Sequence, residues 1–273
     1  MLKTMTASLA ACVFASVTFA QDTANLPEPT ISIDILGFSI GMPADEALAK
    51  IAVEFPGVEA RVQEEYNLAI DSYVPRNVSV TTPGGTFGVS FTGLQSGNRV
   101  YAINRSTGFA IEDRPPLDAT KEALIGKYGL PTFAHDFEYS YNYAPEPIAL
   151  GSESDVRAIL DAETIPFNAF IDLATINGLD GLQQEKQWEC SRQAGYFGTL
   201  VQNWRQFDPE RVKATVVPEC LASMKVGFVH ADNAVTSMTF YLFDHRFAIE
   251  SHAIDIAPFF APPEPATGDV PKL

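Results

Sequence analysis

One segment of the sequence carries regularly spaced rings that could bind a ligand by stacking. Between residues 133 and 143, rings occupy every second position: Phe133, His135, Phe137, Tyr139, Tyr141 and Tyr143. Successive side chains of a β-strand point to opposite faces, so this spacing places all six rings on one face. Tyr139, Tyr141 and Tyr143 would then form a platform for a sugar ring or a peptide proline. The alternative is that these rings form the core side of a sheet.

The histidines do not have the spacing of a metal site. His230 and His245 fall at opposite ends of an expected hairpin, and a strand advances about 3.3 Å per residue, so they lie too far apart to share an ion. His245, His252 and Asp255 are closer in the chain, but no His-x-His or His-Glu-x-x-His motif supports a site there. The sequence therefore predicts no metal ligand and no other cofactor.

Motifs for nucleophilic or phosphate chemistry also give no catalytic prediction. The spacing Gly-x-Ser-x-Gly occurs at residues 37–41 (GFSIG), but the spacing alone is not a nucleophile elbow, and Gly84-Gly85 is not followed by Gly-Lys-Ser/Thr. Acidic pairs such as Glu64-Glu65 would serve glycoside hydrolysis only if two carboxylates lay about 5–10 Å apart across a cleft. No catalytic residue is predicted.

The first twenty residues have the composition of a cleavable signal peptide. Lys3 precedes an uncharged apolar run, and Thr18 and Ala20 are small residues before a cut at Gln21. The alternative is a lipoprotein signal, because residues 9–12 read LAAC and would place a lipid on Cys12. The apolar stretch before Cys12 is short and the chain stays apolar after it, which favours cleavage after Ala20. We expect a periplasmic or secreted protein without a transmembrane segment.

Export also sets the expected state of the other cysteines. Once Cys12 leaves with the signal, Cys190 and Cys220 remain, and two thiols in an oxidising compartment most simply pair. The closed loop of about 30 residues would contribute roughly 3–4 kcal/mol in the chain-entropy model. A redox role is disfavoured because the spacing is not Cys-x-x-Cys.

The net charge of the chain limits the kinds of partner that it can bind through charge. The chain has 34 acidic and 18 basic residues, for a net charge of −16. Such a chain does not bind nucleic acid or anionic lipid through charge. Hydrophobic residues make up 46% of the chain, enough for a sizeable core.

Two helices and two hairpins follow from local patterns. Pro43 starts a helix over 43–55, and Gly129 ends a second helix over 117–128. Period-2 alternation predicts hairpins over 86–104 and 223–243. Between them, Pro145 and Pro147 open a stretch read as a helical insertion at 150–180, with one helix around Phe167 to Ala174.

These elements predict an α+β fold. Helix followed by hairpin occurs twice, which fits an internal duplication. Strands joined by short turns imply an antiparallel sheet with helices packed on one face. We expect a signal peptide at 1–20, a linker at 21–30, the body at 31–257 and a Pro-rich flexible tail at 258–273. Within the body, 31–130 would form the first helix-plus-hairpin unit and 131–257 the second.

Two short motifs resemble known envelope domains. Residues 36–48 read LGFSIGMPADEAL, and residues 128–131 read YGLP. A Gly-Met helix entry with a later Gly-x-Pro resembles the SmpA/OmlA (BamE-like) and β-lactamase-inhibitor-protein type of domain. The resemblance implies helices packed on an antiparallel sheet and a role in binding other proteins. It covers about a score of residues and carries over no functional residue.

Three functions follow as hypotheses. The first is a non-enzymatic envelope protein that binds another envelope protein or a cell-wall component. The second is a secreted hydrolase with a cleft between the sheet and the 150–180 insertion, which requires a concave pocket with at least two titratable side chains. The third is a purely structural envelope protein.

Overall fold

The computed structural model describes most of the predicted body. The described residues are 26–67, 72–135, 137–144, 171–172, 201, 204–216 and 220–261. The predicted signal peptide, Cys190, most of the 150–180 insertion and residues 262–273 of the predicted tail lie outside these ranges. In the described ranges, no helix is both long enough and apolar enough to cross a membrane.

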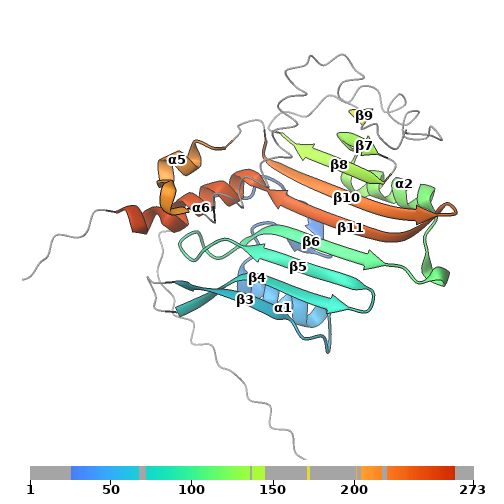
Figure 1. The fold of residues 1–273 in the computed structure, drawn as a ribbon, viewed down its shortest axis with the longest axis horizontal. Helices are drawn as coiled ribbons and strands as arrows, with labels where there is room; N and C mark the ends of the chain where they lie inside the picture. Colours follow the sequence, from blue (N-terminus) through green and yellow to red (C-terminus); the bar gives the residue numbers. More distant parts are fainter. Residues whose placement is uncertain are drawn as a thin grey trace, which may run out of the picture.

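A nine-stranded antiparallel sheet forms the centre of the molecule (Figure 1). Its strands lie in the order β3-β4-β5-β6-β11-β10-β8-β7-β9. Their bounds are β3 Arg61–Asn67, β4 Ser72–Thr82, β5 Gly85–Phe91, β6 Val100–Gly108, β7 Phe133–His135, β8 Glu138–Tyr143, β9 Ile171–Asp172, β10 Ala222–Ala231 and β11 Ala234–Asp244. A separate two-stranded sheet pairs β1 (Asp34–Ile35) with β2 (Phe38–Ser39). The predicted α+β class with an antiparallel sheet is confirmed.

Two of the described helices, α1 and α2, each precede the strands of one half of the sheet. Their bounds are α1 Ala44–Glu54, α2 Leu117–Tyr128, α5 Pro209–Lys213 and α6 His245–Phe260, with 3₁₀ turns η2 Ile111–Asp113 and η4 Trp204–Gln206. Helix α1 precedes β3 to β6, and α2 precedes β7, β8, β10 and β11. The pairing of β6 with β11 joins the two halves into one sheet.

Local signals explain the elements that were predicted. Helix α2 has the predicted bounds, and Gly129 ends it at φ +83°, a conformation that favours glycine. The turn between β10 and β11 consists of Asp232 and Asn233, whose φ values of 52° and 57° suit a tight hairpin. Helix α2 packs on the second half, since Leu117 N donates to Asn233 O. A division of the body at residue 130 therefore separates α2 from the strands that it covers.

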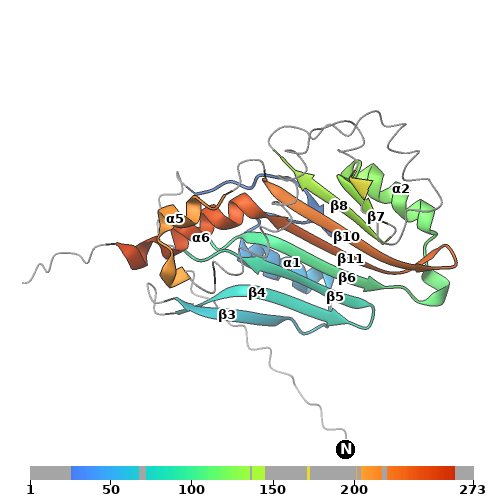
Figure 2. The same ribbon diagram turned by 45° about the horizontal axis from the view of Figure 1, so that its top comes forward.

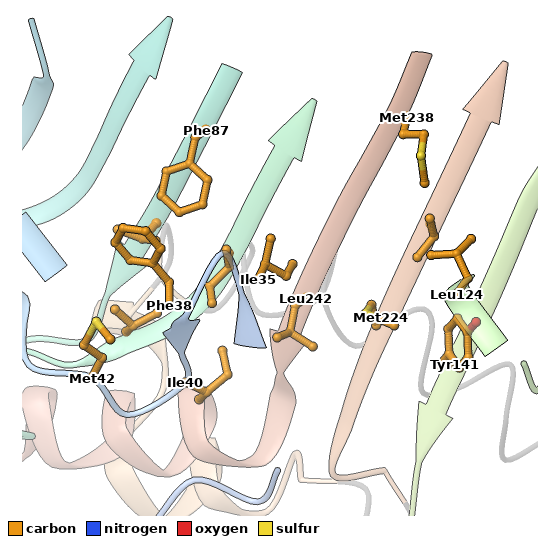
Figure 3. Packing of buried hydrophobic residues seen from close by; sticks show 14 of the residues in the cluster. Ile35, Phe38, Ile40, Met42, Phe87, Leu124, Tyr141, Met224, Met238 and Leu242 are labelled. Atoms are coloured by element: carbon orange, nitrogen blue, oxygen red, sulfur yellow. The ribbon is translucent and has the colours of Figure 1, made fainter. Parts of the chain in front are cut away.

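The main core lies between the sheet, the two leading helices and the β1–β2 hairpin. One row of neighbours in register crosses the sheet: Tyr141, Met224, Leu242, Ile103, Val89 and Val78. Each of these side chains is at most 2% exposed. Phe38 from β2 lies 4.6 Å from Phe87 of β5, ring centre to ring centre, and closes the core beside α1 (Figure 3).

Helix α6 adds a second, smaller core at one end of the sheet. It runs on from β11 and packs with α5 (Figure 2). Ala102 and Phe243 meet its apolar side in a cluster with Ile249, Ala253 and Ile256. Leu242 belongs to the main core, so the adjacent Phe243 points to the opposite face of the sheet. Residues 258–260, predicted to belong to the tail, are the last turn of this helix.

Two further expectations need correction. Ile171 and Asp172, predicted inside a helix, form strand β9 and pair with Ala134 and Phe133 of β7. The C-terminal part of the predicted linker is anchored, because Thr30 N and Oγ1 each donate to Asp244 Oδ2 at 2.7 Å. Contacts with residues far away in the chain explain both departures: pairing with strand β7 in the first case and hydrogen bonds to the Asp244 carboxylate in the second. No local sequence pattern predicts such contacts.

Candidate functional site

The predicted tyrosine platform is not a surface. Tyr139 and Tyr141 are 1% and 2% exposed and belong to the main core, and Tyr143 is half-buried. The ring of Tyr141 meets that of Tyr128 on α2 edge to face, with centres 6.1 Å apart. Burial raises the pKa of both Tyr141 and Tyr143. The prediction of a stacking site at these residues is therefore wrong, because they form the core side of the sheet beneath α2.

The histidines lie apart, as their spacing indicates. His230 stacks on Phe137 near the β10–β11 turn, whereas His245 begins α6 at the other end of the hairpin. His245 Nε2 lies 2.8 Å from Ser223 Oγ, and burial lowers the pKa of its imidazole to about 3. Among the residues that the structure describes, no group of three or more His, Cys, Asp or Glu could hold a metal ion. Cys220 is fully buried.

The described helices and loops leave most of the sheet face opposite α1 and α2 uncovered. In Figure 1 both helices lie behind the strands. We call this surface the open face; its residues are Ser79, Thr81, Thr86, Gly88, Asn104, Ser106, Lys225, Gly227, Val229, Ser237, Thr239 and Tyr241. Most of its side chains are short and polar. Gly88 and Gly227 leave room for Asn104 and Thr239, since a Cβ at either glycine would approach those side chains within 3 Å.

Tyr241 is the large exposed ring of the open face. It is 39% exposed and lies in register between Lys225 on β10 and Asn104 on β6. Its ring stacks on Phe243, with centres 6.1 Å apart, and Phe243 meets Tyr101 edge to face at 5.5 Å. This row of rings connects the exposed tyrosine to the second core, because Phe243 belongs to that core.

A cavity of about 500 Å³ lies where the sheet meets α6. We call it the end pocket. Its lining comes from β3 and β4, the β5–β6 loop, the segment before α5, and α6: Glu65, Tyr66, Val74, Arg76, Gly93, Leu94, Val201, Arg205, His252, Asp255, Ile256 and Phe259. The walls are mainly apolar, and the charged side chains come from four separate segments. This composition is typical of a small-ligand pocket.

A β-bulge gives Arg76 its place in the pocket. Pro75 pairs with Glu64 and Asn77 with Gln63, so Arg76 has no partner residue on β3. A bulged residue points to the same side as its neighbour, which turns Arg76 toward the α6 side of the sheet. Its Nε lies 2.8 Å from Glu65 Oε2 in an ion pair.

Asp255 fixes the loop that forms one wall of the pocket. Its Oδ2 accepts from Gly93 N at 2.6 Å, and its Oδ1 accepts from Ser96 N at 3.0 Å. Ser96 Oγ lies 3.0 Å from both carboxylate oxygens. Burial raises the pKa of Asp255 to about 6, against the opposing effects of Arg76 and of these hydrogen bonds. The carboxylate therefore holds the β5–β6 loop against α6.

Little in the sequence indicates this pocket. The spacing of His245, His252 and Asp255 does not indicate a site, and no motif includes Arg76. Glu65, Arg76 and Asp255 are brought together by the pairing of β3 with β4 and by the position of α6, and neither is encoded in residue spacing. A comparison of the chain with protein-family models, with curated proteins and with solved structures finds no match.

Proposed function

We propose that this chain is an exported, non-enzymatic binding protein of the cell envelope, and that its open face docks another envelope protein or a wall component. The observation that carries the proposal is the side of the nine-stranded sheet that the described residues leave open, where short polar side chains surround the exposed ring of Tyr241. Aromatic side chains among small polar neighbours are typical of binding surfaces.

Export, the Cys190–Cys220 disulfide and the periplasmic or secreted location are part of the same proposal. The composition of residues 1–20 supports export, and the expected oxidising compartment supports the disulfide. The resemblance to SmpA/OmlA and β-lactamase-inhibitor-protein domains supports a role in binding other proteins.

The hydrolase alternative is less well supported. Its expected cleft beside the 150–180 insertion lies largely outside the described residues. The end pocket holds two carboxylates, Glu65 and Asp255, but both oxygens of Asp255 accept hydrogen bonds from the β5–β6 loop. A carboxylate occupied in this way serves to position a loop, whereas a general acid needs an oxygen that reaches the substrate.

Site-specific photo-crosslinking in the envelope tests the proposal. A benzoylphenylalanine at position 241 reports on the open face, and one at Val53 on α1, which is 76% exposed, is the matched control. We expect a discrete adduct from position 241 and none from position 53. A Thr239→Arg change on the same face should remove that adduct because the long side chain crowds the neighbouring surface. Equal crosslinking from both positions, or an adduct unaffected by Thr239→Arg, would contradict the proposal.

A further inference from the structure

The end pocket offers a cationic group among apolar walls in a strongly acidic protein. The Arg76 side chain is 19% exposed, and only its Nε is paired with Glu65. Its two terminal nitrogens have no hydrogen-bond partner among the described residues, and they are the pair that binds a carboxylate in parallel. Arginine at this point therefore gives the pocket a donor pair suited to a planar anion.

The walls of the pocket select against a purely polar ligand. Val74, Leu94 and Ile256 line the interior, and the exposed rings of Tyr66 and Phe259 lie on its rim, 42% and 51% exposed. The volume falls in the range of small-ligand pockets, roughly 300–1,000 Å³. A bare inorganic anion would leave these apolar walls in contact with water, so the fitting ligand carries an apolar part as well as a charge.

The arginines also exclude a cationic ligand. Arg76 and Arg205 both line the cavity. On the acidic side, Glu65 pairs with Arg76, and Asp255 is engaged by the β5–β6 loop. We propose that the end pocket binds a small amphipathic monocarboxylate, with its carboxylate on the terminal nitrogens of Arg76 and its apolar chain between Leu94, Ile256 and Phe259.

Ligand binding at this site is coupled to the uptake of a proton by Asp255. A bound carboxylate at Arg76 places a second negative charge near Asp255 and so favours the neutral form of that side chain. Binding then takes up a proton, and affinity rises as the pH falls through the titration range of Asp255, about 6. Glu65 from β3, Arg205 from the segment before α5 and His252 on α6 also face this cavity. Because protonated His252 would act in the same direction, an Asp255→Asn variant is needed to identify the group responsible.

Calorimetric titration with octanoate, and with 1-octanol as the uncharged analogue, tests the proposal on the full chain. We expect octanoate to bind saturably at one site. Arg76→Gln should weaken octanoate binding by about tenfold or more, which corresponds to about 1.4 kcal/mol. Binding of 1-octanol should be weak and insensitive to that change. Arg61→Gln is the matched control, since Arg61 is an exposed arginine of β3 outside the pocket lining.

A filling variant checks the location of the ligand. Val74→Trp should occupy the cavity and abolish octanoate binding while thermal unfolding shows an intact fold; if that variant does not fold, Leu94→Trp fills the same cavity from the loop. Octanoate binding should also be tighter at about pH 6 than at about pH 8, with a smaller difference in Asp255→Asn. The proposal is overturned by the absence of saturable octanoate binding, by equal affinity in Arg76→Gln, by binding that survives filling, or by a pH dependence unchanged in Asp255→Asn.

Discussion

Burial of the His245 imidazole makes the folded state sensitive to acid. The side chain is 0% exposed, and its folded-state pKa of about 3 lies well below the ordinary value of 6.5. Between these two pKa values the unfolded chain binds a proton that the folded chain does not. The free energy of unfolding therefore falls as the pH drops below about 6.5.

A His245→Gln variant isolates this effect, because glutamine can still hydrogen-bond Ser223 but does not titrate. We expect the wild type to lose about 3 kcal/mol of stability relative to the variant between about pH 7 and pH 4. Urea unfolding at a series of pH values measures the difference. A stability difference that stays constant over this range would show that His245 is not the acid-sensitive group.

Asp255 acts in the opposite direction over an overlapping range. Its pKa is raised to about 6 in the folded state from an ordinary 3.8, so the stability it contributes is present at low pH and is lost as the pH rises through about 6. The two groups partly offset each other between about pH 4 and 6. The combined acid response of these two residues is therefore weaker than that of either alone, and single variants are required to measure each one.

Some elements follow from the sequence because their signals are local. Helix α2 has a proline before it and a glycine after it, and the β10–β11 hairpin has alternating apolar residues and an Asp-Asn turn. Strand β3 gave no such signal, since residues 61–66 at the sheet edge are all exposed and show no alternation of burial. Helix α6 was also missed: Phe247 faces the main core while Ile249 and Ile256 face the second, so its apolar residues form no single stripe.

The start of α6 depends on one carboxylate that connects three segments. Asp244 Oδ1 accepts from Phe247 N at 2.9 Å as the helix N-cap, and Oδ2 accepts both bonds from Thr30. Asp244→Ala removes the cap and leaves Thr30 N without its acceptor, so we expect a loss of about 2–3 kcal/mol. Thr30→Val removes only the hydroxyl bond and should cost about 1 kcal/mol. Urea unfolding compares the two; equal losses would mean that the cap contributes little.

At the scale of the whole molecule, the open face and the end pocket both arise from where helices cover the sheet. Helices α1 and α2 cover one side, and α6 with α5 covers only one end of the other, which leaves the open face and a cavity at the junction. The sequence predicted helices on one side but could not place a site, because Glu65 and Asp255 come to one cavity only through the strand order and the position of α6. The aromatic pattern at 133–143 predicted one strand with all six rings on one face, and this is wrong. Residues 133–135 and 138–143 form the paired strands β7 and β8, in which Ala134 lies opposite Tyr139 and Phe133 lies opposite Ser140. Alternation alone shows neither the break between two strands nor which face is buried.

The continuous core makes a further prediction about cooperativity. Leu242 on β11 lies in the row that crosses the sheet, between Ile103 of the first half and Met224 of the second. If the two halves share one core, Leu242→Ala should lower the stability of both together, by about 2–5 kcal/mol. Calorimetry should then show a single transition in the wild type and in Leu242→Ala, with calorimetric and van't Hoff enthalpies in agreement.

Two further variants test the same point from either side of the sheet. Val89→Ala in the first half and Met224→Ala in the second should each lower the temperature of the same transition. A variant that splits the transition, so that one half unfolds at the wild-type temperature, would show that the β6–β11 pairing joins two independent domains.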